Sequence, residues 1–410
     1  MTSSDDFFSD VKRAQSALKH AILRDYLATF AGATGTNSPG HRVGFIDGYA
    51  GPGQYVDETS GQVVEGSPRI ALGVAKHHAE MTDPRHLKCI FIEKRKSYFE
   101  SLKDLVAAAP TSAEAMYGDV QDHLAAAVGQ FSSTPLLVFL DPFGAALDRD
   151  ATIQAVFQRG DKQPTEVLLN FSVETIRRAG PRIRETEDKF SRDKTVARMD
   201  GWLGGDWWQE YFLDSSLDGN PDGADIAANR VTNEYARRIH ASTGAGVFST
   251  QMRRSASHKA IFTLMLFYPR SLAAFKYNES VSRAQDKWRE TMWDMDVNAA
   301  ARIDALGLTL GQSEAEIVRQ AADADKVQFK ADTIATIKAT IQNTLSTQAS
   351  VSVEKEFRKV FGEAAGVGRS LHLRAAWDEL TAESVTRARN VTKFDRAVIH
   401  RADARVWPSF

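Results

Sequence analysis

The stretch FIDGYAGPG, at residues 45–53, carries the most informative local pattern in this chain of 410 residues. A short apolar run ends at the acid Asp47, and Gly48, Gly51 and Gly53 follow within six residues. Glycine adopts backbone angles that other residues avoid, and it lets the main chain approach a ligand closely. The stretch therefore predicts a buried strand that ends in a tight turn around a ligand.

Further apolar runs follow along the chain, and helical patterns separate them. Strands that alternate with helices are typical of a parallel sheet with crossover helices. The expected strands are residues 43–47, 89–93, 115–118, 136–141, 166–171 and 260–268, with helices at 68–79, 97–108 and 120–131. The pattern predicts an α/β fold with a Rossmann-like sheet.

The length of the chain and a change of pattern near residue 300 predict two domains. Residues 1–298 are expected to form the sheet domain, with a cap inserted around residues 172–235. Residues 299–410 show helical spacing at 313–324, 330–345, 353–361 and 371–388, and then an alternating segment at 391–407. Helices followed by a small hairpin indicate a winged-helix-like domain.

The composition is that of an ordinary globular protein, with 43% hydrophobic residues and a formal net charge of −2. The single cysteine, Cys89, excludes a disulfide framework and a thiolate metal cluster, so no metal site is expected. An acidic N-terminus without an apolar signal core predicts a cytoplasmic protein. No apolar run reaches the roughly 18 residues that a membrane span needs, so no membrane partner is expected.

Acidic residues recur where the predicted strands end: Asp47, Glu93, Asp119 and Asp141. Ligands of open parallel sheets bind beyond the carboxyl ends of the strands. The glycines do not follow the G-x-G-x-x-G spacing, and no phosphate-binding G-x-x-x-x-G-K-[ST] segment is present. An acid before the turn favours a cation over a phosphate, and S-adenosylmethionine carries a sulfonium and an ammonium.

Two of these acids then have an expected partner on the nucleoside part of the cofactor. Glu93 is expected to accept hydrogen bonds from the ribose hydroxyls. Asp119 is placed to bind the exocyclic amine of adenine, with the backbone amide of Val120 on a ring nitrogen. The alternative is structural, because acids at strand ends commonly cap helices.

The segment DPFG follows the fourth strand and contains Asp141, Pro142, Phe143 and Gly144. Amino-methylating enzymes of this fold carry here an Asp, Asn or Ser, then two prolines and an aromatic residue. The first side chain and a proline carbonyl hold the target amine, and the aromatic ring stacks on the base. In this chain Phe143 stands where the second proline is expected. The alternative is that Asp141 caps a turn and Phe143 lies in the core.

Six short sequence segments match a known family of proteins. They are LKHAIL (18–23), FIDGYAGPGQY (45–55), EGSPRIAL (65–72), IFIEK (90–94), FLDPFG (139–144) and LNFS (169–172). Together they resemble the three-Cys-motif partner protein (TcmP) family. The first half is also similar, more distantly, to bacterial 23S rRNA adenine-N6 methyltransferases, and the likeness covers residues 10–290. The resemblance implies a class I methyltransferase fold, S-adenosylmethionine as the cofactor and a three-Cys-motif protein as a partner.

The resemblance also implies site residues at the matching positions. The cofactor residues it implies are Lys19, Asp47, Gly48, Tyr49, Ala50, Gly51, Gly53, Glu93, Asp119 and Val120, and the residues at the target amine are Asp141, Pro142 and Phe143. Lys19 and His20 lie on the first helix, and their alternative is a solvated helix face. Ser67 and Pro68 suit a helix start without any further role.

Two basic segments are candidates for contact with DNA or RNA. Residues 384–405 hold six basic and two acidic side chains, a net charge of +4. The second segment holds Arg177, Arg178, Arg182, Arg184, Arg192 and Arg198, with acids between them. The alternative for both segments is a solvated charged surface.

The hypothesis that follows is an S-adenosylmethionine-dependent methyltransferase acting on an amino group of a nucleic-acid base. Two alternatives stay open. One is the same chemistry on a protein or a small molecule. The other is a catalytically silent methyltransferase-like scaffold that binds a partner protein or DNA.

Overall fold

The computed structural model describes residues 4–56, 63–142, 144, 147–159, 163–253, 258–307 and 311–403, with side chains from residue 17 onward. These residues form two compact units, Met1–Arg270 and Ser271–Phe410. Each unit has its own secondary structure and is described separately below.

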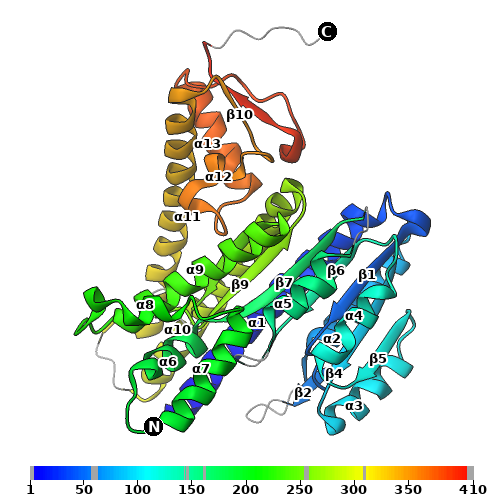
Figure 1. The fold of residues 1–410 in the computed structure, drawn as a ribbon. Helices are drawn as coiled ribbons and strands as arrows, with labels where there is room; N and C mark the ends of the chain where they lie inside the picture. The colour runs from blue at the N-terminus through cyan, green and yellow to red at the C-terminus, as the bar shows by residue number, and fades with distance from the viewer. Residues whose placement is uncertain are drawn as a thin grey trace. The chain divides into compact units, whose positions relative to one another are not determined.

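The first unit is built on a seven-stranded sheet with the strand order β5-β4-β1-β6-β7-β9-β8 (Figure 1). The five strands from β5 to β7 are parallel, and β9 runs antiparallel to both β7 and β8. The strands are β1 (Arg42–Asp47), β4 (His86–Glu93), β5 (Ala113–Tyr117), β6 (Leu136–Leu140), β7 (Thr165–Ser172), β8 (Gly246–Met252) and β9 (Phe262–Tyr268). The predicted Rossmann-like sheet is confirmed.

Edge strand β8 is absent from the expected strands. Its side chains alternate, with Phe248, Thr250 and Met252 buried and Ser249 and Gln251 exposed. This half-buried pattern is typical of an edge strand and is weaker than the continuous apolar run of a central strand.

The two faces of the sheet bury alternate residues of each strand. One face carries Ile46, Ile90 and Val138, which join a hydrophobic core with α4 (Val120–Gly129). The other face carries Phe45, whose ring meets Phe91 edge to face at 6.5 Å. Helices α1 (Ser4–Gly35) and α2 (Ser67–Ala79) pack together and against β1, and α3 (Lys96–Ala107) contacts β4 and β5.

The predicted cap around residues 172–235 is a group of short helices that leads into a long one. Aromatic side chains attach it to the sheet, because Phe171 of β7 stacks on Trp202 at 4.8 Å and on Tyr235 at 4.6 Å between ring centroids. Trp208 is also buried, as expected of core packing. The elements are α6 (Val173–Ala179), η3 (Gly180–Arg184), α7 (Lys189–Leu203), α8 (Gln209–Leu213), η4 (Ser215–Leu217) and α9 (Gly223–Thr243).

The second unit is mainly helical and contains a small antiparallel sheet. Its elements are α10 (Ser271–Ala305), α11 (Glu314–Thr347), β10 (Ser350–Ser352), α12 (Phe357–Phe361), α13 (Ser370–Ala382) and β11 (Val398–His400). β11 pairs with β10, and a bridge joins Thr386 to Arg401. In the part of the chain that the structure describes, no helix combines the length and the apolar character needed to cross a membrane.

The predicted boundary at residue 298 lies inside α10, and the two units divide between Arg270 and Ser271 instead. Asn278 of α10 shows why this helix belongs to the second unit. Its buried side chain accepts a hydrogen bond from the Gly366 amide at 2.6 Å and donates one to the Gly368 carbonyl at 2.7 Å. A buried amide paired on both sides ties α10 to the loop before α13.

Two other expectations for the second unit are corrected. The helices expected at 313–324 and 330–345 are one continuous helix, α11, because no glycine or proline interrupts residues 325–329. The segment 391–407 does not fold back on itself within its described part. β11 pairs with β10, which lies almost 50 residues earlier in the chain.

Replacing Phe171 with alanine is expected to lower the free energy of unfolding by about 3–5 kcal/mol, because the ring is buried between two aromatic partners. Urea denaturation followed by tryptophan fluorescence measures the change. Phe190→Ala is the matched control, since Phe190 is 82% exposed on α7 and its loss should cost less than about 0.5 kcal/mol. Equal losses in the two variants would contradict the role of Phe171 in joining cap and sheet.

Candidate functional site

The turn after β1 is held by the neighbouring strands. The Gly48 amide donates to the Phe139 carbonyl of β6 at 2.9 Å, and the Ala50 amide donates to the Ile92 carbonyl of β4 at 3.0 Å. Gly51 and Gly53 have φ angles of +66° and +83°, in the region that favours glycine. The turn therefore lies across the carboxyl ends of three adjacent strands, as the stretch at residues 45–53 predicts.

Gly48 is required by packing against the core. A Cβ atom on this residue would lie 2.8 Å from the Leu140 side chain and 2.9 Å from the buried Val120 side chain. Gly51 has a different neighbour, because a Cβ there would lie 2.5 Å from the Tyr55 hydroxyl oxygen. Tyr55 belongs to β2 (Gln54–Val56), which pairs with β3 (Val63–Glu65) directly after the turn.

Glu93, at the end of β4, shapes the turn through both of its carboxylate oxygens. Oε2 accepts a hydrogen bond from the Gly51 amide at 2.8 Å, and Oε1 accepts one from the Arg95 amide at 2.6 Å. The residue is only 8% exposed. Each carboxylate oxygen can accept a second hydrogen bond, so this structural role leaves acceptor positions for a ligand.

Asp47, at the end of β1, is fully buried. Its Oδ1 accepts a hydrogen bond from the Tyr49 amide at 3.1 Å, whereas Oδ2 is buried without a hydrogen-bond partner among the described residues. Burial raises the pKa of Asp47 to about 7, and the charge of Asp141 adds to the rise, while the Ser67 hydroxyl, the Tyr49 amide and Lys19 oppose it. The Ser67 hydroxyl lies near this carboxylate, but Oδ2 has no hydrogen bond of normal geometry within the described residues. A buried carboxylate oxygen with too few donors is costly and fits a cationic ligand group.

Asp119 follows β5 and caps α4. Its Oδ1 accepts from the Gln121 amide at 3.2 Å, and its Oδ2 lies 3.4 Å from the Lys94 ammonium. The side chain is 40% exposed. Asp119 therefore has the capping role of the alternative interpretation, and its predicted contact with adenine stays a prediction.

Asp141, at the end of β6, receives two side chains from distant parts of the chain. The Lys19 ammonium of α1 forms an ion pair with Oδ2, and Asn170 Nδ2 of β7 donates to Oδ1 at 2.6 Å. Pro142 is buried, whereas Phe143 lies outside the described residues. The structure thus brings Lys19 to the predicted amine site, in contact with Asp141.

His20 follows Lys19 on α1. Burial, together with the charges of Lys19 and Arg24, lowers the pKa of His20 to about 4, although Asp141 opposes the shift. The imidazole is therefore neutral at pH 7 and contributes no charge to the site. A neutral, partly buried ring differs from the solvated helix face of the alternative interpretation.

Two residues of the site were not predicted from the sequence. Asn170 contacts Asp141, and its Oδ1 is buried without a hydrogen-bond partner in the described part of the chain. Its signal is a polar residue inside the apolar run TEVLLNFS. Tyr55 is 44% exposed, but its hydroxyl lies beside the turn, where partial desolvation and the charge of Asp47 raise its pKa to about 12. Tyr55 stays protonated at neutral pH and can donate a hydrogen bond there.

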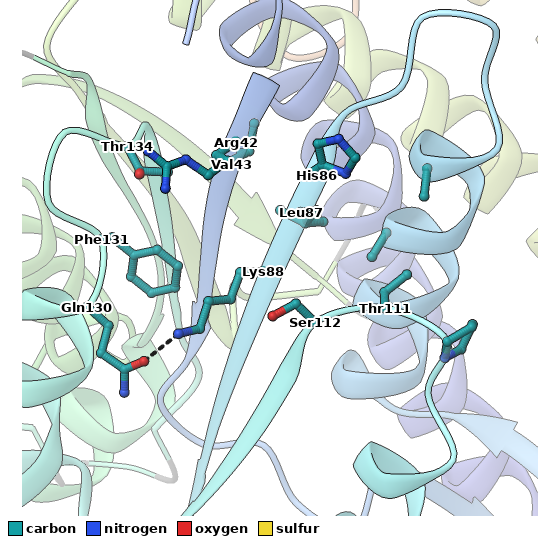
Figure 2. Close-up of a pocket in the computed structure, with 13 residues that line it drawn as sticks. Arg42, Val43, His86, Leu87, Lys88, Thr111, Ser112, Gln130, Phe131 and Thr134 are labelled. Atoms are coloured by element: carbon teal, nitrogen blue, oxygen red, sulfur yellow. Dashed lines mark hydrogen bonds between the residues drawn. The ribbon is translucent and has the colours of Figure 1, made fainter. Parts of the chain in front are cut away.

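A pocket of about 450 Å³ lies at the opposite edge of the sheet, where the parallel strands begin (Figure 2). Arg42 and His86 line it, and Lys88 donates to Gln130 Oε1 at 2.5 Å. Because this pocket is at the amino ends of the strands, it is separate from the ligand edge described above. Within the described residues, no group of three or more His, Cys, Asp or Glu side chains could hold a metal ion.

The basic side chains near the C-terminus divide into paired and unpaired ones. Arg389 pairs with Asp378, and Arg401 pairs with Asp403. Arg387, Lys393 and Arg396 have no ion-pair partner within residues 311–403, and Arg405 lies outside the described residues. The predicted net charge of +4 is therefore partly neutralised on the folded surface.

Comparison with known proteins gives matches in structure alone. No protein-family model matches the sequence, and no curated protein is similar to it. The methyltransferase domain of bacterial CtHen1 is similar in structure, with 11% identity over 60% of this chain and 97% of that one, at a TM-score of 0.31. Protein LPL1258 from Legionella pneumophila has 10% identity over 62% and 84% of the two chains, at a TM-score of 0.34.

A putative caffeoyl-CoA O-methyltransferase from Staphylococcus aureus has 8% identity over 55% of this chain and 76% of that one, at a TM-score of 0.26. Likenesses this weak carry no argument about activity, and the fold assignment rests on the sheet itself. Five parallel strands, an antiparallel β9 between β7 and β8, and a glycine turn after β1 form a Rossmann-like α/β sheet.

Replacing Gly51 with valine is expected to weaken the binding of sinefungin, an analogue of S-adenosylmethionine, by at least about tenfold. A side chain is strained at φ +66°, and its Cβ would displace the Tyr55 hydroxyl. Isothermal titration calorimetry measures the Kd. Gly73→Ala on α2 is the control, because no atom lies within 4 Å of its Cβ position. An unchanged Kd in Gly51→Val would mean that the turn faces away from the ligand.

Proposed function

We propose that this chain is an S-adenosylmethionine-dependent methyltransferase that methylates an amino group of a nucleic-acid base and works with a three-Cys-motif partner protein. The observation that carries the proposal is the fully buried Asp47 carboxylate beside the glycine turn at the ligand edge of the sheet, whose Oδ2 has no hydrogen-bond partner among the residues the structure describes. This edge is where open parallel sheets bind their ligands.

The cofactor assignment is supported by the chemistry of the acids around the turn. Asp47 Oδ2 would accept a hydrogen bond from the α-ammonium group, and the free acceptor positions of Glu93 would take the ribose hydroxyls. Asp119 and the Val120 amide would hold the adenine. A buried anion strongly favours a cationic ligand over a phosphate, because its charge is screened little by solvent. When bound, S-adenosylmethionine supplies an electrophilic methyl group on its sulfonium.

An amine acceptor is supported by two adjacent oxygen atoms. Asp141 keeps acceptor positions beyond the bonds from Lys19 and Asn170, because a carboxylate has about four lone-pair sites. Asn170 Oδ1 is a second, unpartnered acceptor beside it. Two N–H bonds held by these oxygens would orient the nitrogen lone pair outward. Alignment of this kind serves the reaction without a strong base, since the proton can leave after the methyl group has been accepted.

The nucleic-acid substrate and the three-Cys-motif partner are supported by the resemblance of the sequence words at residues 18–172. One observation favours a second candidate, a catalytically silent scaffold that binds a partner protein or DNA. Lys19 is paired with the carboxylate that the acceptor amine would use, and Phe143 replaces the second proline of the motif. The two candidates differ in cofactor binding and in methyl transfer.

Two measurements test the proposed function. Sinefungin binding is measured by calorimetry and by thermal shift. Transfer of a radioactive methyl group from S-adenosylmethionine to host RNA, DNA and protein fractions is measured next, and mass spectrometry identifies the product. We expect binding and a methylated base. Absence of both a binding heat and a thermal shift would contradict the proposed methyltransferase activity and favour the scaffold. Radioactive label found in the protein fraction alone would contradict the proposed nucleic-acid substrate.

Asp141→Ala is expected to lower kcat by at least about 100-fold, because the acceptor amine loses its principal hydrogen-bond acceptor. The Kd for sinefungin should stay within about threefold, since Asp141 holds the acceptor. Asp150→Ala is the control, because Asp150 is an exposed carboxylate that pairs with Arg149. Full activity in Asp141→Ala would reduce Asp141 to a structural residue.

The affinity for sinefungin is expected to fall below pH 7. The pKa of Asp47 is raised to about 7, so the free protein takes up a proton below that pH and loses the anion that binds the ligand amine. The Kd should rise about tenfold for each pH unit below the pKa. His20, with a pKa of about 4, stays neutral over this range. Calorimetry from pH 5.5 to 8 measures the profile, and Asp47→Asn should make it flat.

A further inference from the structure

The six arginines between residues 177 and 198 are not equivalent in the folded chain. Four of them have an acidic partner within 3.0 Å. These pairs are Arg177 with Glu174 and Asp225, Arg182 with Glu185, Arg184 with Asp218, and Arg192 with Asp193. Arg178 and Arg198 have no ion-pair partner in the part of the chain that the structure describes. Acidic residues within and outside this segment therefore neutralise four of the arginines, and Arg178 and Arg198 remain exposed.

The two unpaired arginines converge on one pocket of about 300 Å³. Arg178 reaches it from α6 and Arg198 from α7, while Arg182 of η3 lines it from between these helices. The hydroxyl-bearing Thr175 and Thr195 complete the polar lining. The single acid of the lining is Glu174, which the Arg177 guanidinium binds at 2.6 Å. The pocket therefore has an excess of positive charge.

The pocket adjoins the residues that are expected to hold the acceptor amine. A Cβ atom on Gly144, three residues after Asp141, would lie 3.4 Å from the Thr175 Oγ1 atom that lines the pocket. Thr175 also hydrogen-bonds Ser172 at 2.8 Å, and Ser172 follows Asn170 by two residues on β7. Thr175 is therefore linked to the acceptor site through both the DPFG turn and strand β7.

We propose that this pocket binds a backbone phosphodiester of the nucleic acid whose base is methylated, an inference that rests on the proposed function. Guanidinium groups bind phosphate oxygens through two parallel N–H donors, and threonine hydroxyls add neutral donors. A phosphate beside the acceptor site would place the neighbouring nucleotide in a defined register while carrying no sequence information. The pocket would thus supply affinity for a polyanion beside a ligand edge that is rich in carboxylates.

The double variant Arg178→Gln/Arg198→Gln tests the pocket. Fluorescence anisotropy measures the binding of a fluorescein-labelled 20-nucleotide single-stranded RNA, and of the DNA of the same sequence, between 50 and 200 mM salt. Each lost phosphate contact should reduce the slope of log K against log salt by about 0.7. Because the two arginines hold one phosphate, the double variant is expected to lose about 0.7 from the slope and at least tenfold in affinity at the lowest salt.

Arg192→Gln is the matched control. It removes one positive charge from the same helix, but Arg192 is paired with Asp193 and does not line the pocket. Its salt slope should change by less than half as much as that of the double variant. Circular dichroism verifies the fold of each variant, and the Kd for sinefungin should be that of the unmodified chain.

Unchanged RNA affinity and an unchanged salt slope in a folded double variant would contradict phosphate binding by the pocket. An equal loss of affinity in Arg192→Gln would contradict it as well. If poly-glutamate competes as strongly as unlabelled RNA, the ligand of the pocket is an acidic protein segment and not a phosphodiester. Tighter binding of either RNA or DNA, with loss in the double variant, supports the pocket and identifies the source of the phosphate. If the chain binds no sinefungin but the double variant loses RNA affinity, the proposed methyltransferase function is contradicted and phosphate binding by the pocket is supported.

Discussion

The Glu93 carboxylate is the interaction on which the ligand edge depends. It accepts hydrogen bonds from the amides of Gly51 and Arg95, at 2.8 and 2.6 Å, and so joins the turn after β1 to the end of β4. Charged acceptors make stronger hydrogen bonds than neutral ones, and this carboxylate is almost fully buried. With the turn held in this way, Asp47 remains beneath it with one oxygen unpartnered.

Two opposite electrostatic environments lie next to each other on the first unit. The ligand edge around Asp47, Glu93 and Asp141 is rich in carboxylates, and the Lys19 ammonium forms an ion pair with Asp141. The cap beyond Gly144 carries the unpaired Arg178 and Arg198. A cationic cofactor would face the carboxylates, and a polyanionic substrate would face the arginines. The proposed cofactor site and the proposed phosphate pocket therefore have opposite charges and lie next to each other. The chain as a whole has a net charge of only −2, so its composition does not indicate that acidic and basic groups are separated into two regions.

Much of the first unit could be predicted because its signals are local. Continuous apolar runs indicate the central strands, and the glycine pattern indicates the turn. Both elements can therefore be predicted from residues that are close together in the sequence. Strand β8 and helix α10 could not be assigned in the same way. An edge strand has a weak alternating pattern, and α10 belongs to the second unit through long-range contacts, which include its packing on α11 and the hydrogen bonds of Asn278 with the loop near Gly366.

The sequence by itself determined the Rossmann-like sheet, the glycine turn and the line of acids at the strand ends, because hydrophobic periodicity and backbone requirements act between near neighbours. Tertiary structure alone decided which acid caps a helix, which holds the turn and which stays unpartnered. It also brought Lys19, Asp141 and Asn170 together, and among the described residues it left Arg178 and Arg198 without an ion-pair partner. Hydrogen bonds and ion pairs select partners by distance in space, and residues 122 positions apart, such as Lys19 and Asp141, become neighbours only after the chain has folded.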